Sequence, residues 1–150
     1  MPEARLAITC GLPKSGKTTY ARGLQEAGWA RVCPDEIRQA LHGQGHHPPA
    51  EPLVWANAEL TVRALLLSGH AVVVDATNTT SKRRAPWLGI SRDLDVPLEA
   101  FVFQTPAAEC HERNQASGDP VPPEVIDRMN EQWEPVTEEG VTTRAIDAEG

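Results

Sequence analysis

The stretch that decides the fold is Gly11-Leu12-Pro13-Lys14-Ser15-Gly16-Lys17-Thr18. It matches the phosphate-loop pattern G-x-x-x-x-G-K-[S/T], whose backbone amides surround a polyphosphate. An apolar segment of strand length, 6–10, precedes the motif, and a segment with helical spacing, 18–27, follows it. A strand before the loop and a helix after it are the setting that the motif requires. The sequence therefore predicts a nucleoside triphosphate site rather than an ordinary glycine-rich turn.

Each part of the motif has an expected role at that site. The glycines lack a Cβ, so the backbone can come close to the phosphates. Lys17 is expected to reach the β- and γ-phosphates, and Thr18 to bind Mg²⁺. We therefore expect ATP and Mg²⁺ as cofactors. The predicted nucleotide-binding residues within and beside the motif are Gly11, Pro13, Lys14, Ser15, Gly16, Lys17, Thr18 and Thr19.

Length and composition limit what else the chain contains. A chain of 150 residues is long enough for one good core and too short for two, so we expect a single domain over 1–150. The formal net charge of −7 disfavours a protein that coats nucleic acid without specificity, although it allows a local basic cleft. Cys10, Cys33 and Cys110 lie far apart and form no Cys-x-x-Cys pair, which indicates a reducing compartment.

No segment indicates a membrane or an export signal. The longest apolar runs, such as 64–67 and 71–74, are far shorter than the roughly 20 residues that a membrane span needs, and the first residues do not resemble a leader. We therefore expect a cytoplasmic protein that does not enter a membrane. Nothing in the sequence indicates a stable protein partner or a particular oligomeric state.

Strand-like and helix-like segments alternate along the chain, which predicts an α/β fold with a parallel sheet, helices on both faces and the ligand at the carboxyl ends of the strands. The segment 43–49 reads as a loop without a regular element, because it contains two prolines and two glycines. In the helix at 51–68 we expect the apolar set to be Leu53, Ala56, Leu60, Val62, Ala64, Leu65 and Leu67. The expected strands are 6–10, 30–33, 71–74, 98–103 and 141–146, and the expected helices are 18–27, 35–42, 51–68, 82–94, 107–117 and 122–133.

Three charged residues follow predicted strands. Asp75 ends the apolar run 71–74, where a carboxylate can hold the water shell of Mg²⁺ or orient a neighbouring arginine; an ordinary strand-end residue is the alternative. Asp35 and Arg38 lie three residues apart on a short helix and share a face. Such a carboxylate can take the proton of an attacking hydroxyl, and such an arginine can bind an anionic acceptor. A helix cap and an exposed ion pair are the alternative here.

The sequence resembles the phage-type polynucleotide 5′-hydroxyl kinase family over roughly residues 6 to 140. The matching segments, in order, are 11–22, 35–38, 74–78 with 82–84, 112–114 and 121–122. The resemblance implies a P-loop kinase fold with a five-stranded parallel sheet and a helical lid at roughly 113–128. It implies that Lys17 and Thr18 bind the phosphates and Mg²⁺, that Asp35 is the general base, and that Arg38 holds the acceptor's 3′-phosphate. Asp75, Asn78 and the lid residue Arg113 also match active-site positions, Arg113 as a ligand of the ATP phosphates.

The sequence also departs from that family. A second lid arginine is usual about four residues beyond Arg113, and this chain has Ser117 there; Arg113 or Arg128 is a candidate to supply the charge. No Asp-x-Asp phosphatase signature follows, so we expect only the kinase half of an end-healing enzyme. His46 and His47 could bind a metal, but a solvated loop is the simpler interpretation because no third ligand is near.

Other conspicuous residues have mainly structural interpretations. The four tryptophans are spread along the chain as core residues would be, with base stacking as an alternative for Trp55. Arg83 and Arg84 either contact an acceptor phosphate or lie on a solvated helix face. The acidic stretch 131–139 is interpreted as a solvated helix end and tail.

The function predicted from the sequence is that of an ATP-dependent kinase that transfers the γ-phosphate to a hydroxyl. Lys17, Asp35, Arg38 and Arg113 are the predicted catalytic residues, and the 5′-OH of a polynucleotide is the preferred acceptor. One alternative is a small-molecule kinase of the same fold, acting on a nucleoside, sugar, antibiotic or nucleotide sugar. Another is a non-catalytic ATP-binding switch protein.

Overall fold

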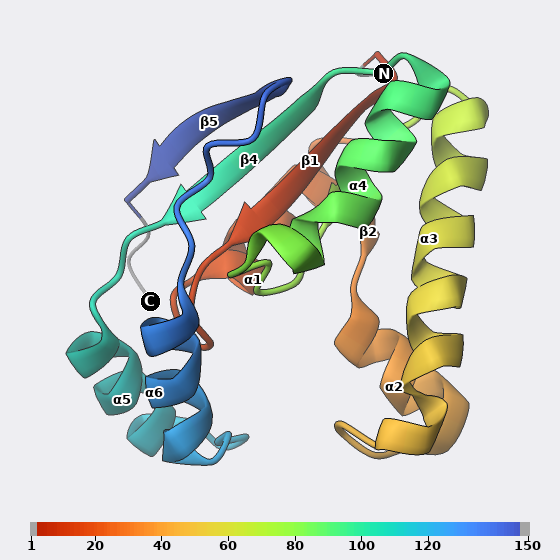
Figure 1. The fold of residues 1–150 in the computed structure, drawn as a ribbon. Coiled ribbons are helices and arrows are strands. Elements are labelled where there is room, and N and C mark those ends of the chain that lie inside the picture. Colours follow the sequence, from red (N-terminus) through yellow and green to blue (C-terminus); the bar gives the residue numbers. More distant parts are fainter. Residues whose placement is uncertain (1–2, 148–150) are drawn as a thin grey trace.

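Five parallel strands form one sheet in the order β2-β3-β1-β4-β5. The computed structural model describes residues 3–147. The strands are β1 (Arg5–Cys10), β2 (Ala30–Val32), β3 (Ala71–Val74), β4 (Leu98–Phe103) and β5 (Val141–Ile146). The prediction of a five-stranded parallel sheet is therefore confirmed. The carboxyl ends of β1, β4 and β5 point toward the lower part of the view in Figure 1, which is the edge where the phosphate loop begins.

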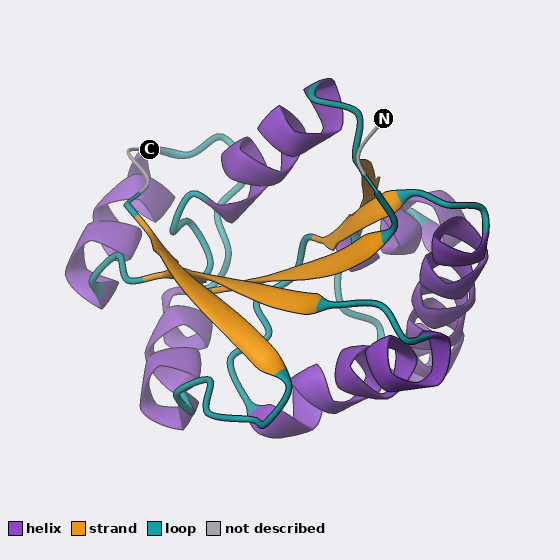
Figure 2. Cartoon of the chain, turned by 90° about the horizontal axis from the view of Figure 1, so that it is seen from above, coloured by secondary structure: helices purple, strands orange, loops and turns teal. Residues whose placement is uncertain are grey.

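Helices cover both faces of the sheet and extend beyond its carboxyl edge. Helix α1 packs on one face, and α3 and α4 pack on the other (Figure 2). At the carboxyl edge, α5 and α6 lie on one side and α2 on the other, with the phosphate loop between them (Figure 1). The helices are α1 (Lys17–Glu26), α2 (Pro34–His42), α3 (Glu51–Leu67), α4 (Ser81–Leu94), α5 (Ala107–Ala116) and α6 (Pro123–Gln132).

Successive side chains of the central strands point to opposite faces of the sheet, so each face has its own hydrophobic cluster. Leu6 and Ile8 of β1 pack with Val62 of α3 and Trp87 of α4. The intervening Ala7 packs on the opposite side, in a cluster that contains residues of α1 and β4. Both sets are almost fully buried, as expected for a central parallel strand with helices on each face. The strands are therefore rigid supports for the loops at their carboxyl ends.

Helix α3 buries only part of the predicted apolar set, since Val62 is buried and Leu65 packs against the core. The buried residues are Val54, Ala58, Val62 and Leu66, which follow one another at intervals of four. Three residues of the predicted apolar set, Leu53, Leu60 and Leu67, are 59, 70 and 74 % exposed. The helix is apolar on more than one side, so periodicity alone does not identify the buried face. Val54, Ala58, Val62 and Leu66 are buried against the rest of the fold, and the three exposed leucines face away from it.

Most element boundaries agree with the sequence to within one residue. The loop at 43–49 is an exception, because a short 3₁₀ helix, Pro48–Ala50, begins inside it and leads into α3. The prolines at positions 48 and 49 favour this start, since their fixed φ suits the first turn of a helix. Over the described residues, 3–147, no helix is both long and apolar enough to cross a lipid bilayer.

Candidate nucleotide-binding and phosphotransfer site

The phosphate loop connects β1 to α1 and depends on glycine at two places. Gly16 has φ of 102° and is the N-cap of α1, a left-handed conformation that residues with a Cβ resist. A Cβ on Gly11 would lie 2.7 Å from Ser15 Oγ and 2.9 Å from Phe103 Cβ, so the loop could not keep its shape. Thr105 of the β4–α5 connection donates to the Ser15 carbonyl at 3.0 Å. The loop is thus held from outside as well as by its own turns.

The side chain of Lys17 folds back onto the phosphate loop and is hydrogen-bonded to it. Its Nζ donates to the Leu12 carbonyl at 2.6 Å and to Ser15 Oγ at 3.4 Å, and the residue is only 7 % exposed. Burial lowers the pKa of Lys17 to about 8, although the carboxylates of Asp75 and Asp35 act in the opposite direction. A cation in this position, with its water already removed, is suited to bind phosphate oxygens strongly.

The lowered pKa of Lys17 predicts a pH dependence of nucleotide binding. Bound phosphates favour the ammonium form and raise the pKa again. Mg·ATP binding should therefore take up a proton above pH 8, and affinity should fall by up to about tenfold per pH unit as pH rises above 8. Calorimetry in two buffers of different ionisation enthalpy measures this uptake. Lys17→Met should bind weakly and without the pH dependence; proton-neutral binding by the parent protein at pH 8.5 would contradict the prediction.

Asp75 lies directly beyond β3 and is 4 % exposed. Nε and Nη2 of Arg31 both donate to its Oδ2, at 2.9 and 2.7 Å, and Arg31 also pairs with Glu36. Asp75 therefore orients an arginine, which is one of the two roles predicted for it. Sequence analysis did not single out Arg31, although an arginine within an otherwise apolar strand, Ala30–Val32, is an unusual position that merits notice.

The residues at this edge fit a Mg²⁺ ion bound mainly through nucleotide phosphates. Such an ion usually keeps several waters and takes one or two oxygens from the protein. Thr18, exposed in the first turn of α1, and Asp75 would supply them. Within residues 3–147, no three or more His, Cys, Asp or Glu side chains are arranged to hold a metal ion. His46 and His47 therefore belong to no such cluster.

The predicted acceptor residues lie at the start of α2 and are joined by a residue that the sequence did not identify. Arg38 donates to Asp35 Oδ1 at 2.5 Å. It also forms a bidentate pair with Glu51, from Nε to Oε2 at 2.9 Å and from Nη2 to Oε1 at 2.7 Å. The hydrogen bond from Arg38 is the main reason that the pKa of Glu51 falls to about 2. Glu51 is 13 positions from Arg38, and no motif links them in the sequence.

Exposure distinguishes these three side chains. The Asp35 side chain is 84 % exposed, whereas those of Arg38 and Glu51 are 13 and 12 % exposed. Asp35 is therefore accessible to a substrate, while the Arg38–Glu51 pair forms part of the wall behind it. Trp55 lies beside that wall, with the guanidinium carbons of Arg83 and Arg38 at 4.8 and 5.8 Å from its ring centroid. The alternative of base stacking on Trp55 would require Arg83 to move from the ring.

On the donor side, the predicted lid residue Arg113 reaches the phosphate loop. Its Nη1 donates to the Lys14 carbonyl at 3.2 Å, and its Nη2 donates to Glu109 at 2.9 Å. Ser117, which occupies the place of a second lid arginine, accepts a hydrogen bond from Lys14 Nζ at 3.1 Å. A pocket of about 360 Å³ lies nearby, between Leu12, the end of β4 and the end of α6.

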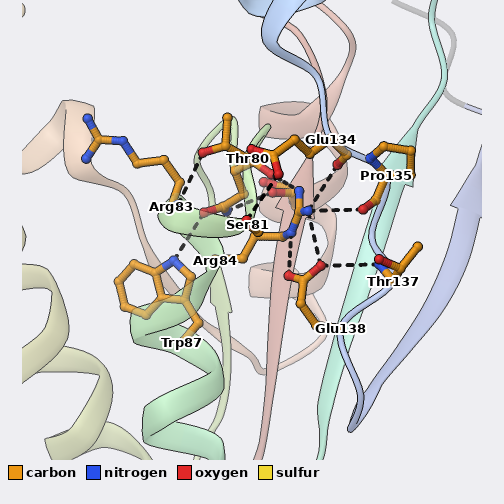
Figure 3. Close-up of polar contacts among 11 residues, drawn as sticks. Thr80, Ser81, Arg83, Arg84, Trp87, Glu134, Pro135, Thr137 and Glu138 are labelled. Atoms are coloured by element: carbon orange, nitrogen blue, oxygen red, sulfur yellow. Dashed lines mark hydrogen bonds and ion pairs between the residues drawn. The ribbon is translucent and has the colours of Figure 1, made fainter.

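Arg84 is neither a phosphate ligand nor a surface residue, so both interpretations of it were wrong. It is 1 % exposed, and Figure 3 shows its guanidinium surrounded by the segment that follows α6. It donates to the carbonyls of Asn78, Glu134 and Pro135 and to both carboxylate oxygens of Glu138. The interpretation of 131–139 as wholly solvated fails for the same reason, since Glu138 is half-buried in this pairing. Arg83 points away from the network and is exposed (Figure 3).

Asn78 has a supporting position rather than an exposed one. It is 2 % exposed, its side-chain amide donates to the Thr9 carbonyl at 2.8 Å, and its Oδ1 accepts from the Trp87 indole at 3.1 Å. Its φ of 43° is left-handed, which asparagine tolerates well. With both ends of the amide used, Asn78 fixes the loop after β3 against β1, and substrate contact by this side chain is not favoured.

A phosphate loop at the first strand, a carboxylate at the end of the neighbouring strand and the strand order β2-β3-β1-β4-β5 together define a P-loop kinase fold. A family model described as an AAA domain matches residues 6–136. The chain belongs to that family.

Comparison with individual proteins agrees with this assignment. One chain in a structure of the Pnkp1/Rnl/Hen1 RNA repair complex is 26 % identical, with a TM-score of 0.76 over 88 % of this chain and 44 % of that one. The L-seryl-tRNA(Sec) kinase of Methanococcus maripaludis is 23 % identical over 138 residues, which are 86 % of this chain and 52 % of that protein. The Mycobacterium tuberculosis APS kinase CysC, 19 % identical, shares the fold over 99 % of this chain and 92 % of its own, with a TM-score of 0.68. The chain thus spans about half the length of the first two relatives.

Proposed function

We propose that the protein is an ATP-dependent phosphotransferase that moves the γ-phosphate of Mg·ATP to a hydroxyl. The observation that carries the proposal is that a phosphate loop with a buried lysine, Lys17, and an exposed carboxylate, Asp35, both follow parallel strands at the carboxyl edge of one sheet. The donor residues and the exposed carboxylate of the acceptor side therefore lie at the same edge of the sheet. The kinases among its relatives support the same class of reaction.

In the proposed reaction, the acceptor oxygen attacks the γ-phosphorus in line while the bond to the β-phosphate oxygen breaks and ADP leaves. Asp35 takes the proton of the attacking hydroxyl, and Arg38 holds the carboxylate in place through its 2.5 Å hydrogen bond. Lys17 and Arg113 stabilise the charge on the transferred group. Thr18 and Asp75 would hold the Mg²⁺, which neutralises phosphate charge when bound.

We propose the 5′-OH end of a polynucleotide as the acceptor. The arrangement of Asp35 and Arg38 at the start of α2 suits a hydroxyl with a neighbouring anionic group. The likeness to a chain of an RNA repair complex, at 26 % identity and a TM-score of 0.76, supports the same choice. Residues 113–128, which include the end of α5 and the start of α6, are the proposed lid over the donor site.

A small-molecule acceptor is the second candidate, and one observation favours it. The charge of Arg38 is balanced by Glu51 and Asp35 together, and that of Arg31 by Asp75 and Glu36. A phosphate arriving at Arg38 would compete with a bidentate carboxylate that is already desolvated. An uncharged acceptor meets no such competition.

A transfer assay separates these candidates. The protein is incubated with γ-labelled ATP and, in parallel, with a 5′-OH oligonucleotide, a nucleoside, the nucleoside 3′-phosphate and a set of sugars. Label on the oligonucleotide, with a KM that rises steeply with salt, is the expected result. Equal activity on the nucleoside and its 3′-phosphate, with no effect of salt, would support the small-molecule kinase. Nucleotide binding without transfer to any acceptor would point to a switch protein.

Glu51→Gln tests whether the ion pair limits binding of an anionic acceptor. Glutamine keeps the size of the side chain but removes the negative charge that opposes a phosphate at Arg38. The KM for the 3′-phosphorylated acceptor should fall by roughly fivefold to tenfold, while the KM for the bare nucleoside changes little. Glu59→Gln, two turns further along α3, is the matched control. A rise in both KM values would mean instead that Glu51 is needed to hold Arg38 in position.

A further inference from the structure

Lys14 adopts an unusual backbone conformation within the phosphate loop. Its φ is 68°, in the left-handed region. Three residues other than glycine have positive φ in the described part of the chain, and the other two are Asn78 and Asp95. Asparagine and aspartate enter this region readily, whereas lysine does so less easily. A glycine would fit the position without strain, so the lysine side chain should contribute something that offsets the conformation.

The side chain of Lys14 leaves the loop and reaches the turn between α5 and α6, residues 117–120, here called the corner. Its Nζ donates to the Asp119 carbonyl at 2.7 Å and to Ser117 Oγ at 3.1 Å, over sequence separations of 105 and 103 residues. Ser117 Oγ also accepts from the Asp119 backbone amide at 3.0 Å. The corner thus presents two oxygens, in a turn closed on itself, to one ammonium group.

In a third contact, the donor lies on α5 and the acceptor is in the phosphate loop. Arg113, on the last turn of α5, donates to the Lys14 carbonyl at 3.2 Å. The ammonium groups of the two lysines in the loop therefore bind different parts of the protein. Lys17 Nζ returns to the loop itself, at Leu12 and Ser15, whereas Lys14 Nζ faces the corner.

We propose that Lys14 is a positioning residue that holds the corner, and with it Arg113, against the phosphate loop before nucleotide binds. When a segment is already in its binding position, the ligand does not have to supply the free energy of ordering it. Mg·ATP then meets a donor site in which loop and lid are assembled. The contact itself needs only the described residues, and its kinetic consequence rests on the proposed function.

Lys14→Gly tests the contact directly, because glycine suits a φ of 68° and removes the ammonium without adding strain. Hydrogen exchange is measured on the nucleotide-free protein. Amides of residues 113–121 should exchange about tenfold faster or more than in the parent, as expected when charge-assisted hydrogen bonds are lost. Amides of β1 and β3 serve as the folding control and should keep their protection.

Two further variants make the test specific. Ser117→Ala removes one of the two acceptors and should increase exchange at the corner by a smaller factor, and adding it to Lys14→Gly should have little further effect. Lys14→Arg retains a cationic donor and should keep exchange close to that of the parent. Unchanged exchange at the corner in Lys14→Gly would overturn the proposal.

The kinetic arm separates this role from direct phosphate binding. If Lys14 positions the corner, the loss of kcat/KM in Lys14→Gly falls mainly in the KM for ATP, by about tenfold, and Ser117→Ala moves the KM in the same direction. A fall mainly in kcat, with a silent Ser117→Ala, would show that Lys14 contacts the transferred phosphate and would overturn the proposal. If the parent protein transfers no phosphate at all, the proposed function fails, while faster exchange in Lys14→Gly still supports the contact.

Discussion

Lys17→Ala is expected to reduce phosphate transfer by at least about 10³-fold. The substitution removes a desolvated cation that would otherwise bind the β- and γ-phosphates, where charge develops during transfer. The fold should remain, because the lysine contacts the loop rather than the apolar core. Lys17→Ala loses the hydrogen bond to the Leu12 carbonyl, but it also removes the desolvation cost that lowers the pKa of Lys17, so the midpoint of thermal unfolding should not fall.

The measurement combines steady-state transfer with calorimetric titration of Mg·ATP and a thermal unfolding curve. Lys82→Ala is the matched control, because Lys82 is exposed in the first turn of α4. It should keep parental turnover. Parental turnover in Lys17→Ala would show that the donor site lies elsewhere, and the absence of Mg·ATP binding by the parent at millimolar nucleotide would contradict every kinase assignment.

Asp35→Asn should lower kcat by about 10²-fold or more and change the KM for ATP little. Asparagine keeps the shape of the side chain and can still accept a hydrogen bond from Arg38, but it cannot take the proton of the attacking hydroxyl. The 84 % exposure of this side chain allows a substrate to reach it in the nucleotide-free protein.

Asp93→Asn is a suitable control for charge, since Asp93 is an exposed carboxylate paired with Arg63 on the α3–α4 face. It should leave kcat unchanged. If Asp35→Asn instead weakens only ATP binding, the residue belongs to the donor side and the general-base assignment is wrong.

The features that were predictable from sequence depend on local chemistry. The phosphate loop needs Gly16 for a left-handed backbone conformation, which is a local requirement that the motif itself reveals. Gly11 also depends on a distant neighbour, because a Cβ there would lie 2.9 Å from Phe103 Cβ. The parallel sheet follows from apolar runs alternating with helical segments. Asp75 was located because a charged residue at the end of a buried strand is conspicuous.

The features that were missed depend on contacts between distant segments. Glu51 meets Arg38 only because α2 and α3 pack side by side, and Arg84 becomes buried only because the segment after α6 crosses α4. An arginine in the first turn of a helix, next to another arginine, gives no local indication that it is surrounded by carbonyls. The buried face of α3 was partly misassigned for a related reason: the helix is apolar on more than one side, and its packing on the sheet, not its periodicity, decides which residues are buried.

Arg84 also determines how the donor side of the molecule can move. The hydrogen bond from Arg84 holds the pKa of Glu138 below its usual range, which favours the carboxylate form of Glu138 in this pair. The chain that leaves α6 is therefore attached to α4 at residues 134–138. We therefore expect residues 134–138 to stay with α4 when the α5–α6 segment moves, because separation would leave the buried guanidinium of Arg84 without its partners.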